Sequence, residues 1–140
     1  MIYSIAGREL TESFEGCQLS AYQDVKGVWT IGYGHTNGVM PGDTCTQQDA
    51  EDWLQQDIQW AAHAVAAEVN VELTQGEFDA LVDFVFNVGS GNFRTSTLLK
   101  MLNAGDYAGA AHQLEQWDMS GGKHVAGLLR RRLAEEKEFN

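Results

Sequence analysis

Two carboxylates and one threonine lie close together near the start of the chain, at Glu15, Asp24 and Thr30. Eight residues separate Glu15 from Asp24 and five separate Asp24 from Thr30, in a stretch rich in glycine and aromatic residues. Glycoside hydrolysis requires one carboxylic acid that protonates the leaving oxygen and a second carboxylate that holds a water or stabilises the transition state. A hydroxyl beside the second carboxylate would orient that water. The structural alternative is two solvated charges and an ordinary strand residue.

A helix end is expected at the first carboxylate. Residues 8–15 have helical composition, and Gly16 follows them at the point where a helix favours a residue that tolerates positive φ. Glu15 would then lie at a helix C-terminus. There the negative end of the helix dipole and the apolar surface of Phe14 disfavour an ionised carboxylate, which suits a general acid.

A β-hairpin is expected at the other two residues. Lys26-Gly27 predicts a tight turn, and residues 28–31 (VWTI) predict a strand after it. Asp24 would lie near the tip of the hairpin and Thr30 on the returning strand. A helix end that faces such a hairpin forms a cleft, with the acid on one wall and the carboxylate and hydroxyl on the other.

This stretch resembles the phage-type lysozyme, or endolysin, family. Thr30 is followed by IGYGHT at residues 31–36, and the spacing, the residue types and the glycines all agree with the family motif. The likeness continues at residues 73–99 (LTQGEFDALVDFVFNVGSGNFRTSTLL) and 127–139 (GLLRRRLAEEKEF), which resemble the helical lobe of lambdoid-phage endolysins. By this resemblance Glu15 is the general acid, and Asp24 and Thr30 position the water that attacks the anomeric carbon from the opposite face.

The resemblance also implies a fold. We expect one lysozyme-like catalytic domain over residues 1–140, of the α+β class and mainly α. Its parts would be a small hairpin lobe, a long linking helix and a helical lobe, with the active-site cleft between the lobes. The expected bounds of these parts are about 16–45, 47–67 and 74–140.

Four further residues are candidates for substrate binding: Gly34, Thr36, Phe86 and Asn87. Glycines in the strand region would let a sugar ring approach the backbone, and a β-bulge is the alternative reason for them. Phe86 and Asn87 lie near the end of a predicted helix, where the family lines its cleft. The alternative for Phe86 is that it belongs to the core.

An ion pair is expected between His35 and Asp57. Residues 47–67 contain no Gly or Pro and predict one long helix, and Asp57 falls on its apolar stripe. An acid on a buried face requires a partner, and the family alignment places His35 opposite it. We interpret His35 as a structural residue and not a catalytic one.

Two capping boxes mark helix starts, at Thr46 with Asp49 and at Thr74 with Glu77. The last predicted helix, at residues 125–139, carries the run Arg130-Arg131-Arg132. One of these arginines would reach the cleft and pair with Glu15, or the run is a salt-bridged solvent face.

Composition limits the kinds of partner that the chain is expected to bind. The chain has 20 acidic and 9 basic residues, a net charge of −11, and residues 49–90 hold nine acids and no base. We interpret this stretch as a solvated acidic helix face, and the charge argues against nucleic-acid binding. No run has the length of a membrane helix, and the N-terminus lacks the apolar stretch of a signal peptide.

The expected partner is bacterial peptidoglycan, bound by a monomer. The chain would be made in the host cytoplasm and act in the periplasm. Either another factor lets it through the inner membrane, or an N-terminal export segment such as some relatives carry has been removed.

No cofactor and no metal is expected, because the four histidines are scattered and have no ligand spacing with the cysteines. Cys17 and Cys45 bracket the hairpin region. They form either a disulfide or two free thiols, and spacing alone does not decide between these because it does not show that the Cβ atoms meet.

The leading functional prediction is a muramidase that cleaves the β-1,4 bond between N-acetylmuramic acid and N-acetylglucosamine by an inverting single displacement and so lyses the host cell. One alternative is a lytic transglycosylase, which needs a single acid. The other is a non-enzymatic peptidoglycan-binding or particle module that kept the fold. The joint presence of Glu15, Asp24 and Thr30 argues against both alternatives.

Overall fold

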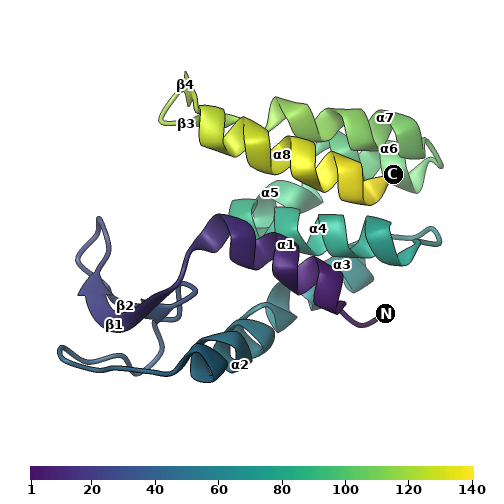
Figure 1. Ribbon diagram of the computed structural model, residues 1–140. Coiled ribbons are helices and arrows are strands. Elements are labelled where there is room, and N and C mark those ends of the chain that lie inside the picture. Colours follow the sequence, from purple (N-terminus) through teal and green to yellow (C-terminus); the bar gives the residue numbers. More distant parts are fainter. The chain divides into compact units, whose positions relative to one another are not determined.

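The computed structural model describes all 140 residues, which form two compact units: residues 11–59, and residues 1–10 together with 60–140. We call the first the hairpin unit and the second the helical unit. The predicted class, α+β and mainly α, is confirmed (Figure 1). The elements in chain order are α1 (Ile5–Glu15), β1 (Gln18–Gln23), β2 (Trp29–Gly32), α2 (Gln47–Asp57), α3 (Gln59–Glu68), α4 (Gln75–Val88), α5 (Ser90–Arg94), α6 (Thr97–Asn103), α7 (Tyr107–Gln113), the 3₁₀ turn η1 (Leu114–Gln116), β3 (Met119–Ser120), β4 (Lys123–His124) and α8 (Ala126–Phe139).

The predicted hairpin is present in the hairpin unit. Strands β1 and β2 pair antiparallel, with Tyr22 opposite Thr30 and Gln23 opposite Trp29. Gly27 in the turn between them has a φ of +82°, a conformation that glycine adopts without strain. The register shifts between Gln18 and Tyr22, so β1 carries an irregularity of the bulge type.

The predicted helix at residues 47–67 forms two helices in the structure. Helix α2 starts at the expected capping box, in which Thr46 and Asp49 bond each other's backbone N–H. It ends at Asp57, and α3 begins at Gln59. The junction residue Ile58 is fully buried with a ψ of −9°, which departs from regular helix. No glycine or proline marks this break, so the sequence holds no signal for it.

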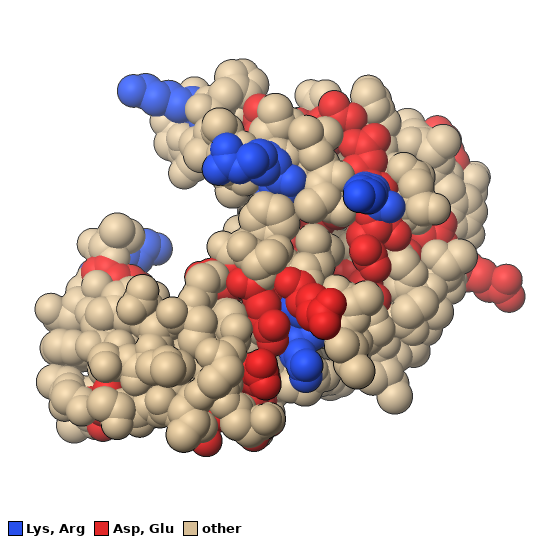
Figure 2. All heavy atoms as spheres, viewed as in Figure 1, with Lys and Arg blue, Asp and Glu red and all other residues tan.

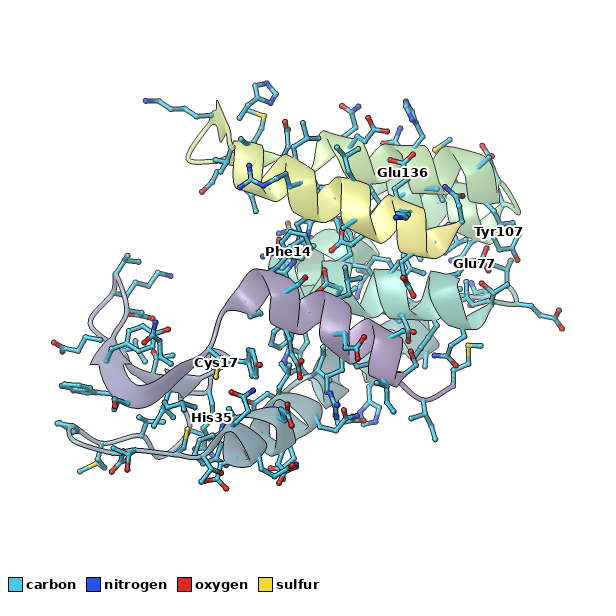
Figure 3. The ribbon with its side chains drawn as sticks, in the orientation of Figure 1. Phe14, Cys17, His35, Glu77, Tyr107 and Glu136 are labelled. Carbon is cyan, nitrogen blue, oxygen red and sulfur yellow. The ribbon has the colours of Figure 1, made fainter.

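His35 and Asp57 are in contact, as expected. His35 lies in the loop after β2 (Figure 3). Its Nδ1 is 2.8 Å from Oδ2 of Asp57 at the end of α2. The imidazole also stacks on Trp53, with ring centroids 4.6 Å apart and an interplanar angle of 9°. Backbone bonds of 2.9 Å in both directions join His35 to Ile31. The His35 side chain therefore connects the hairpin to α2.

Helix α4 is the central element of the helical unit. It starts at the predicted capping box of Thr74 and Glu77, and residues 78–85 are all buried. α4 packs on α8, and a Cβ at Gly76 would clash with the backbone carbonyl of Glu138. Glycine is therefore needed at residue 76 by the close approach of the two helices.

The interpretation of residues 49–90 as a solvated acidic face is wrong for two of the acids. Asp79 is 1% exposed and accepts hydrogen bonds from the backbone and side chain of Ser4 and from Gln75. Asp83 is fully buried. Elsewhere the acidic excess is at the surface, where Asp and Glu outnumber Lys and Arg on the face drawn in Figure 2. Burying an acid requires polar partners, and these come from segments distant in sequence.

The interpretation of the arginine run as a solvent face is wrong for Arg131 and Arg132. Arg131 forms a bidentate pair with Asp83, with Nε–Oδ2 of 3.0 Å and Nη2–Oδ1 of 2.8 Å. Arg132 is fully buried, and its Nη2 donates to Glu135 at 2.8 Å. These four side chains form a buried charge cluster between α4 and α8, in which two cations balance two anions. Arg130 is exposed, and the predicted pairing of one arginine of the run with Glu15 stays a prediction.

None of the helices combines the length and the apolar character that crossing a bilayer would require.

The contact of His35 with Asp57 predicts a stability effect. We expect His35→Ala to lower the free energy of unfolding by about 2 kcal/mol, because the charged hydrogen bond is lost and Asp57 keeps no imidazole partner. Turnover should fall much less than stability. Urea unfolding at pH 7 together with a turnover assay measures both, and the exposed His63→Ala is the control. Unchanged stability in His35→Ala would contradict the structural role of the pair.

The buried charge cluster predicts a pH effect. Burial, with the neighbouring Asp83 carboxyl, raises the pKa of Glu135 well above its usual range, and burial also lowers the pKa of Arg132. A carboxyl whose pKa is higher in the folded than in the unfolded state adds stability at low pH, and this contribution is lost as the pH rises through the folded-state pKa.

We therefore expect the stability of the wild type, relative to the isosteric Glu135→Gln, to decline between pH 5 and pH 9. Urea unfolding at pH 5, 7 and 9 measures this difference, with the exposed Glu9→Gln as the control. A difference that grows with pH would contradict the raised pKa of Glu135.

Candidate active site

The first predicted catalytic residue, Glu15, is the last residue of α1 and is half-buried. Gly16 follows with a φ of +68°, and its N–H bonds the carbonyl of Glu12 at 3.4 Å. The prediction that Glu15 lies at a helix C-terminus is confirmed. A carboxyl at this position is fixed by the helix on one side and by the left-handed glycine on the other.

Asp24 is half-buried in the hairpin turn and holds that turn in shape. Its Oδ1 accepts the backbone N–H of Lys26 at 2.8 Å and of Val28 at 2.9 Å. The backbone N–H of Asp24 itself donates to the carbonyl of Val28 at 2.9 Å. Both side-chain bonds use the same oxygen, so Oδ2 is the oxygen left for a water or a substrate.

Thr30 is buried on β2, with 4% of its surface exposed. Its hydroxyl donates to the carbonyl of Val28 at 2.9 Å. Because a hydroxyl has one hydrogen, Oγ1 can then act toward any further partner only as an acceptor. Glu15, Asp24 and Thr30 all belong to the hairpin unit, where Asp24 and Thr30 each bond a backbone group of Val28.

The substrate-binding candidates Gly34 and Thr36 are both exposed in the loop after β2. Gly34 has a φ of +80° and open space where a Cβ would be, so its backbone is accessible. Glycine is needed at residue 32 for a different reason, because a Cβ there would lie 3.1 Å from the Cβ of Ala50. The glycine at residue 32 thus lets β2 approach α2, whereas contact of Gly34 with a sugar stays a prediction.

The other two candidates, Phe86 and Asn87, have different surroundings in the helical unit. Phe86 is half-buried, and its ring centroid lies 5.9 Å from that of Trp60 at a 33° tilt. Asn87 is exposed and lines a pocket with Trp117 and Arg132. Their roles toward a substrate stay predictions, as does the cleft.

Sequence reasoning did not single out Trp60 or Trp117. Trp60 is 45% exposed, which is unusual for so large an apolar side chain. A tryptophan that follows the polar Gln59 and lies off the apolar stripe of its helix was an available signal for Trp60. Trp117 follows η1 at helical spacing from Ala110 and Leu114, a pattern that predicts a core residue and does not mark a site.

Cys17 and Cys45 are both free thiols in the structure. Burial raises the pKa of each thiol, and Cys17 also bonds Oε1 of Gln47 at 3.7 Å. A raised thiol pKa lowers the thiolate fraction, so neither cysteine is suited to act as a nucleophile.

One group of side chains has metal-ligand types. His112, Glu115 and Glu136 place their ligand atoms within 4.8 Å of one another, and Figure 3 labels Glu136 on α8. Nδ1 of His112 is 3.1 Å from Oε2 of Glu115, and burial followed by a hydrogen bond with Glu115 raises the pKa of Glu136. These contacts are those of a surface ion-pair network, which needs no metal.

Comparison with known proteins gives a consistent result. The Phage lysozyme family matches residues 12–135, a range that includes Glu15, Asp24 and Thr30. The endolysin of Acyrthosiphon pisum secondary endosymbiont phage 1 is 43% identical over 99% of this chain and 98% of its own length. The SAR-endolysin of bacteriophage PS119 is 42% identical over 94% of this chain and 79% of its own length.

A solved structure agrees with these sequence relatives. A point mutant of P22 lysozyme superposes with a TM-score of 0.93 and 36% identity, covering 99% of this chain and 98% of the other. The similarity thus extends over nearly the whole chain in both sequence and fold, and it confirms the predicted lysozyme-like fold. This chain therefore belongs to the phage lysozyme family.

Proposed function

We propose that this endolysin, a glycoside hydrolase that hydrolyses peptidoglycan in host lysis, cleaves the β-1,4 bond between N-acetylmuramic acid and N-acetylglucosamine in an inverting single displacement. What supports the proposal is one observation. A carboxyl at a helix C-terminus, a carboxylate with one oxygen uncommitted and a hydroxyl that can only accept occur together in the hairpin unit.

Each of the three residues has a chemical role in this proposal. Glu15 protonates the glycosidic oxygen as the leaving group departs. A water donates one hydrogen to Oδ2 of Asp24 and the other to Oγ1 of Thr30, so that an oxygen lone pair points to the anomeric carbon. Attack from the face opposite the leaving group, with one proton of the water passing to Oδ2 of Asp24, inverts the anomeric configuration. The proposal requires a separation of roughly 6.5–9.5 Å between the two carboxyl groups, against about 5–5.5 Å in retaining enzymes.

Asp24 has two roles in this proposal, and they use different oxygens. Oδ1 bonds two backbone N–H groups of the turn, so the carboxylate cannot rotate freely. Oδ2 is then fixed relative to Thr30, whose hydroxyl bonds the carbonyl of Val28 in the same turn. A water held between two fixed acceptors needs little reorganisation before it attacks.

The proposed location follows from a relative, and the proposed partners follow from the net charge and the site residues. The name SAR-endolysin of one relative supports action on the host cell wall in the periplasm after synthesis in the cytoplasm. A net charge of −11 argues against nucleic acid as a partner. A monomer is sufficient, since the three proposed catalytic residues belong to one chain.

The two rival functions predict different products from purified sacculi. A hydrolytic muramidase releases muropeptides that end in reducing N-acetylmuramic acid. A lytic transglycosylase releases anhydro ends, lighter by one water, and would leave Asp24 and Thr30 without a water to hold. A binding module releases nothing and remains on the sacculi. Mass spectrometry of the digest distinguishes all three.

Replacing the proposed acid tests the mechanism. We expect Glu15→Gln to reduce muropeptide release by at least about 100-fold, because the amide cannot protonate the leaving oxygen. Its melting temperature should equal or exceed that of the wild type, since active-site acids often cost stability. Glu9→Gln, on the same helix and exposed, is the control and should keep full activity. Near-normal activity of Glu15→Gln would overturn the assignment.

Removing the hydroxyl that is proposed to hold the water tests the second half of the mechanism, the attack by that water. Thr30→Ala should lower kcat by about 10- to 100-fold, as expected for one lost hydrogen bond in the transition state, and should leave binding to sacculi intact. Thr30→Ser keeps an acceptor oxygen and should recover most of the rate. Equal rates for the Ala and Ser variants would mean that the hydroxyl does not position the water.

A further inference from the structure

The hairpin turn carries an exposed cation beside one of the proposed catalytic residues. Lys26 is exposed two residues after Asp24, and its backbone N–H donates to Oδ1 of Asp24 at 2.8 Å. Val25 before it is fully exposed, and Gly27 after it has a φ of +82°, so this part of the turn projects into solvent. The backbone of Lys26 is therefore fixed relative to Asp24, while its ammonium group is accessible.

Lys26 is the only lysine or arginine of the hairpin unit. Residues 11–59 hold eight acids beside it, and its ammonium group forms an ion pair with none of them. Asp57 pairs with the imidazole of His35 instead, and Asp24 bonds the backbone of the turn. A cation that stays unpaired in a unit so rich in acids is available to an anion from outside the chain.

The substrate polymer has the same sign of charge as the protein. The stem peptides of peptidoglycan contain carboxylates, and this chain has a net charge of −11, so the overall charges oppose the approach of the two. Charges further apart than about 8–10 Å are largely screened at physiological ionic strength, whereas a direct ion pair is screened less. A cation placed at the reacting sugar would therefore act where the overall repulsion no longer matters.

The proposed reaction brings a stem peptide to this turn. The bond that breaks starts at the anomeric carbon of N-acetylmuramic acid, and the same sugar carries the stem peptide through the lactyl ether on its O3. In the proposed mechanism a water held by Asp24 attacks that anomeric carbon. The sugar that bears the stem thus lies next to Asp24, and Lys26 is the cation of the hairpin unit that can reach the stem.

We propose that the ammonium group of Lys26 pairs with a carboxylate of the stem peptide on the N-acetylmuramic acid that is cleaved, and so favours glycan that carries such stems. This inference rests on the proposed function, because the role of Asp24 gives the position of that sugar. Lys26 acts in binding and not in the chemical step. Loss of its charge should accordingly change KM and leave kcat as it is.

Kinetics on two forms of one substrate test this pairing. The substrate is soluble glycan strands with their stem peptides, either native or treated with carbodiimide and ammonia so that the carboxylates become neutral amides. We expect Lys26→Gln to raise KM for the native strands by about two- to fivefold, the range for one exposed ion pair, with kcat unchanged. On the amidated strands the wild type and Lys26→Gln should have the same KM. Lys26→Arg keeps the cation and should behave as the wild type.

The matched control is Lys100→Gln. Lys100 is also exposed and without an ion pair, but it belongs to α6 in the helical unit. Its replacement changes the net charge by the same amount and should leave KM unchanged. An equal rise of KM in the two glutamine variants would trace the effect to overall charge and overturn the proposal.

Three further results would contradict the pairing of Lys26 with a stem carboxylate. They are an unchanged KM of Lys26→Gln on native strands, a rise that persists on amidated strands, and a fall in kcat alone, which would mean that Lys26 acts through Asp24. The products of the wild type are read by mass spectrometry in the same experiment. Reducing N-acetylmuramic acid ends in those products, together with any of the contradicting results, would show that this inference fails while the proposed function holds.

Discussion

The buried charge cluster of Asp83, Arg131, Arg132 and Glu135 is the constraint on which the helical unit depends. Four buried ionisable groups are stable only when each has a close partner, so the contacts of the cluster constrain how α4 packs on α8. The same requirement explains Gly76, because the helices approach too closely for a side chain there. It also explains why Phe84 is immobile, since the guanidinium of Arg132 lies on its ring. The pocket beside this cluster is therefore preorganised.

The hairpin unit holds two of the proposed catalytic residues, Asp24 and Thr30, through the hydrogen bonds of its turn. Backbone N–H groups of the turn bond one oxygen of Asp24, and the hydroxyl of Thr30 bonds a carbonyl of the same turn. Asp24 and Thr30, which we propose to be catalytic, are thus part of the hydrogen bonding that forms the turn. The His35 imidazole, between Asp57 and Trp53, then fastens the hairpin to α2. Substitutions at Asp24 should accordingly affect structure and chemistry together, whereas Glu15 and Thr30 allow the two to be separated.

The acidic composition is divided between two kinds of site. Some carboxylates, such as Asp79 and Asp83, are buried because segments distant in sequence supply donors to them. Others remain at the surface and carry the excess negative charge (Figure 2). Net charge alone therefore describes the partners of the protein poorly. The action on peptidoglycan proposed above depends on individual side chains such as Glu15, Asp24 and Thr30, and less on overall attraction between opposite charges.

The sequence by itself determined the elements whose signals are local. Spacing, residue types and the family resemblance singled out Glu15, Asp24 and Thr30 as the proposed catalytic residues. Capping boxes located the starts of α2 and α4, and helical periodicity identified Asp57 as an acid that needs a partner. Tertiary structure alone decided which arginines of the run are buried and where the helix after Thr46 is interrupted. The reason is physical. Caps and periodicity act within a few residues, whereas Asp83 and Arg131 are 48 residues apart and meet only because two helices pack.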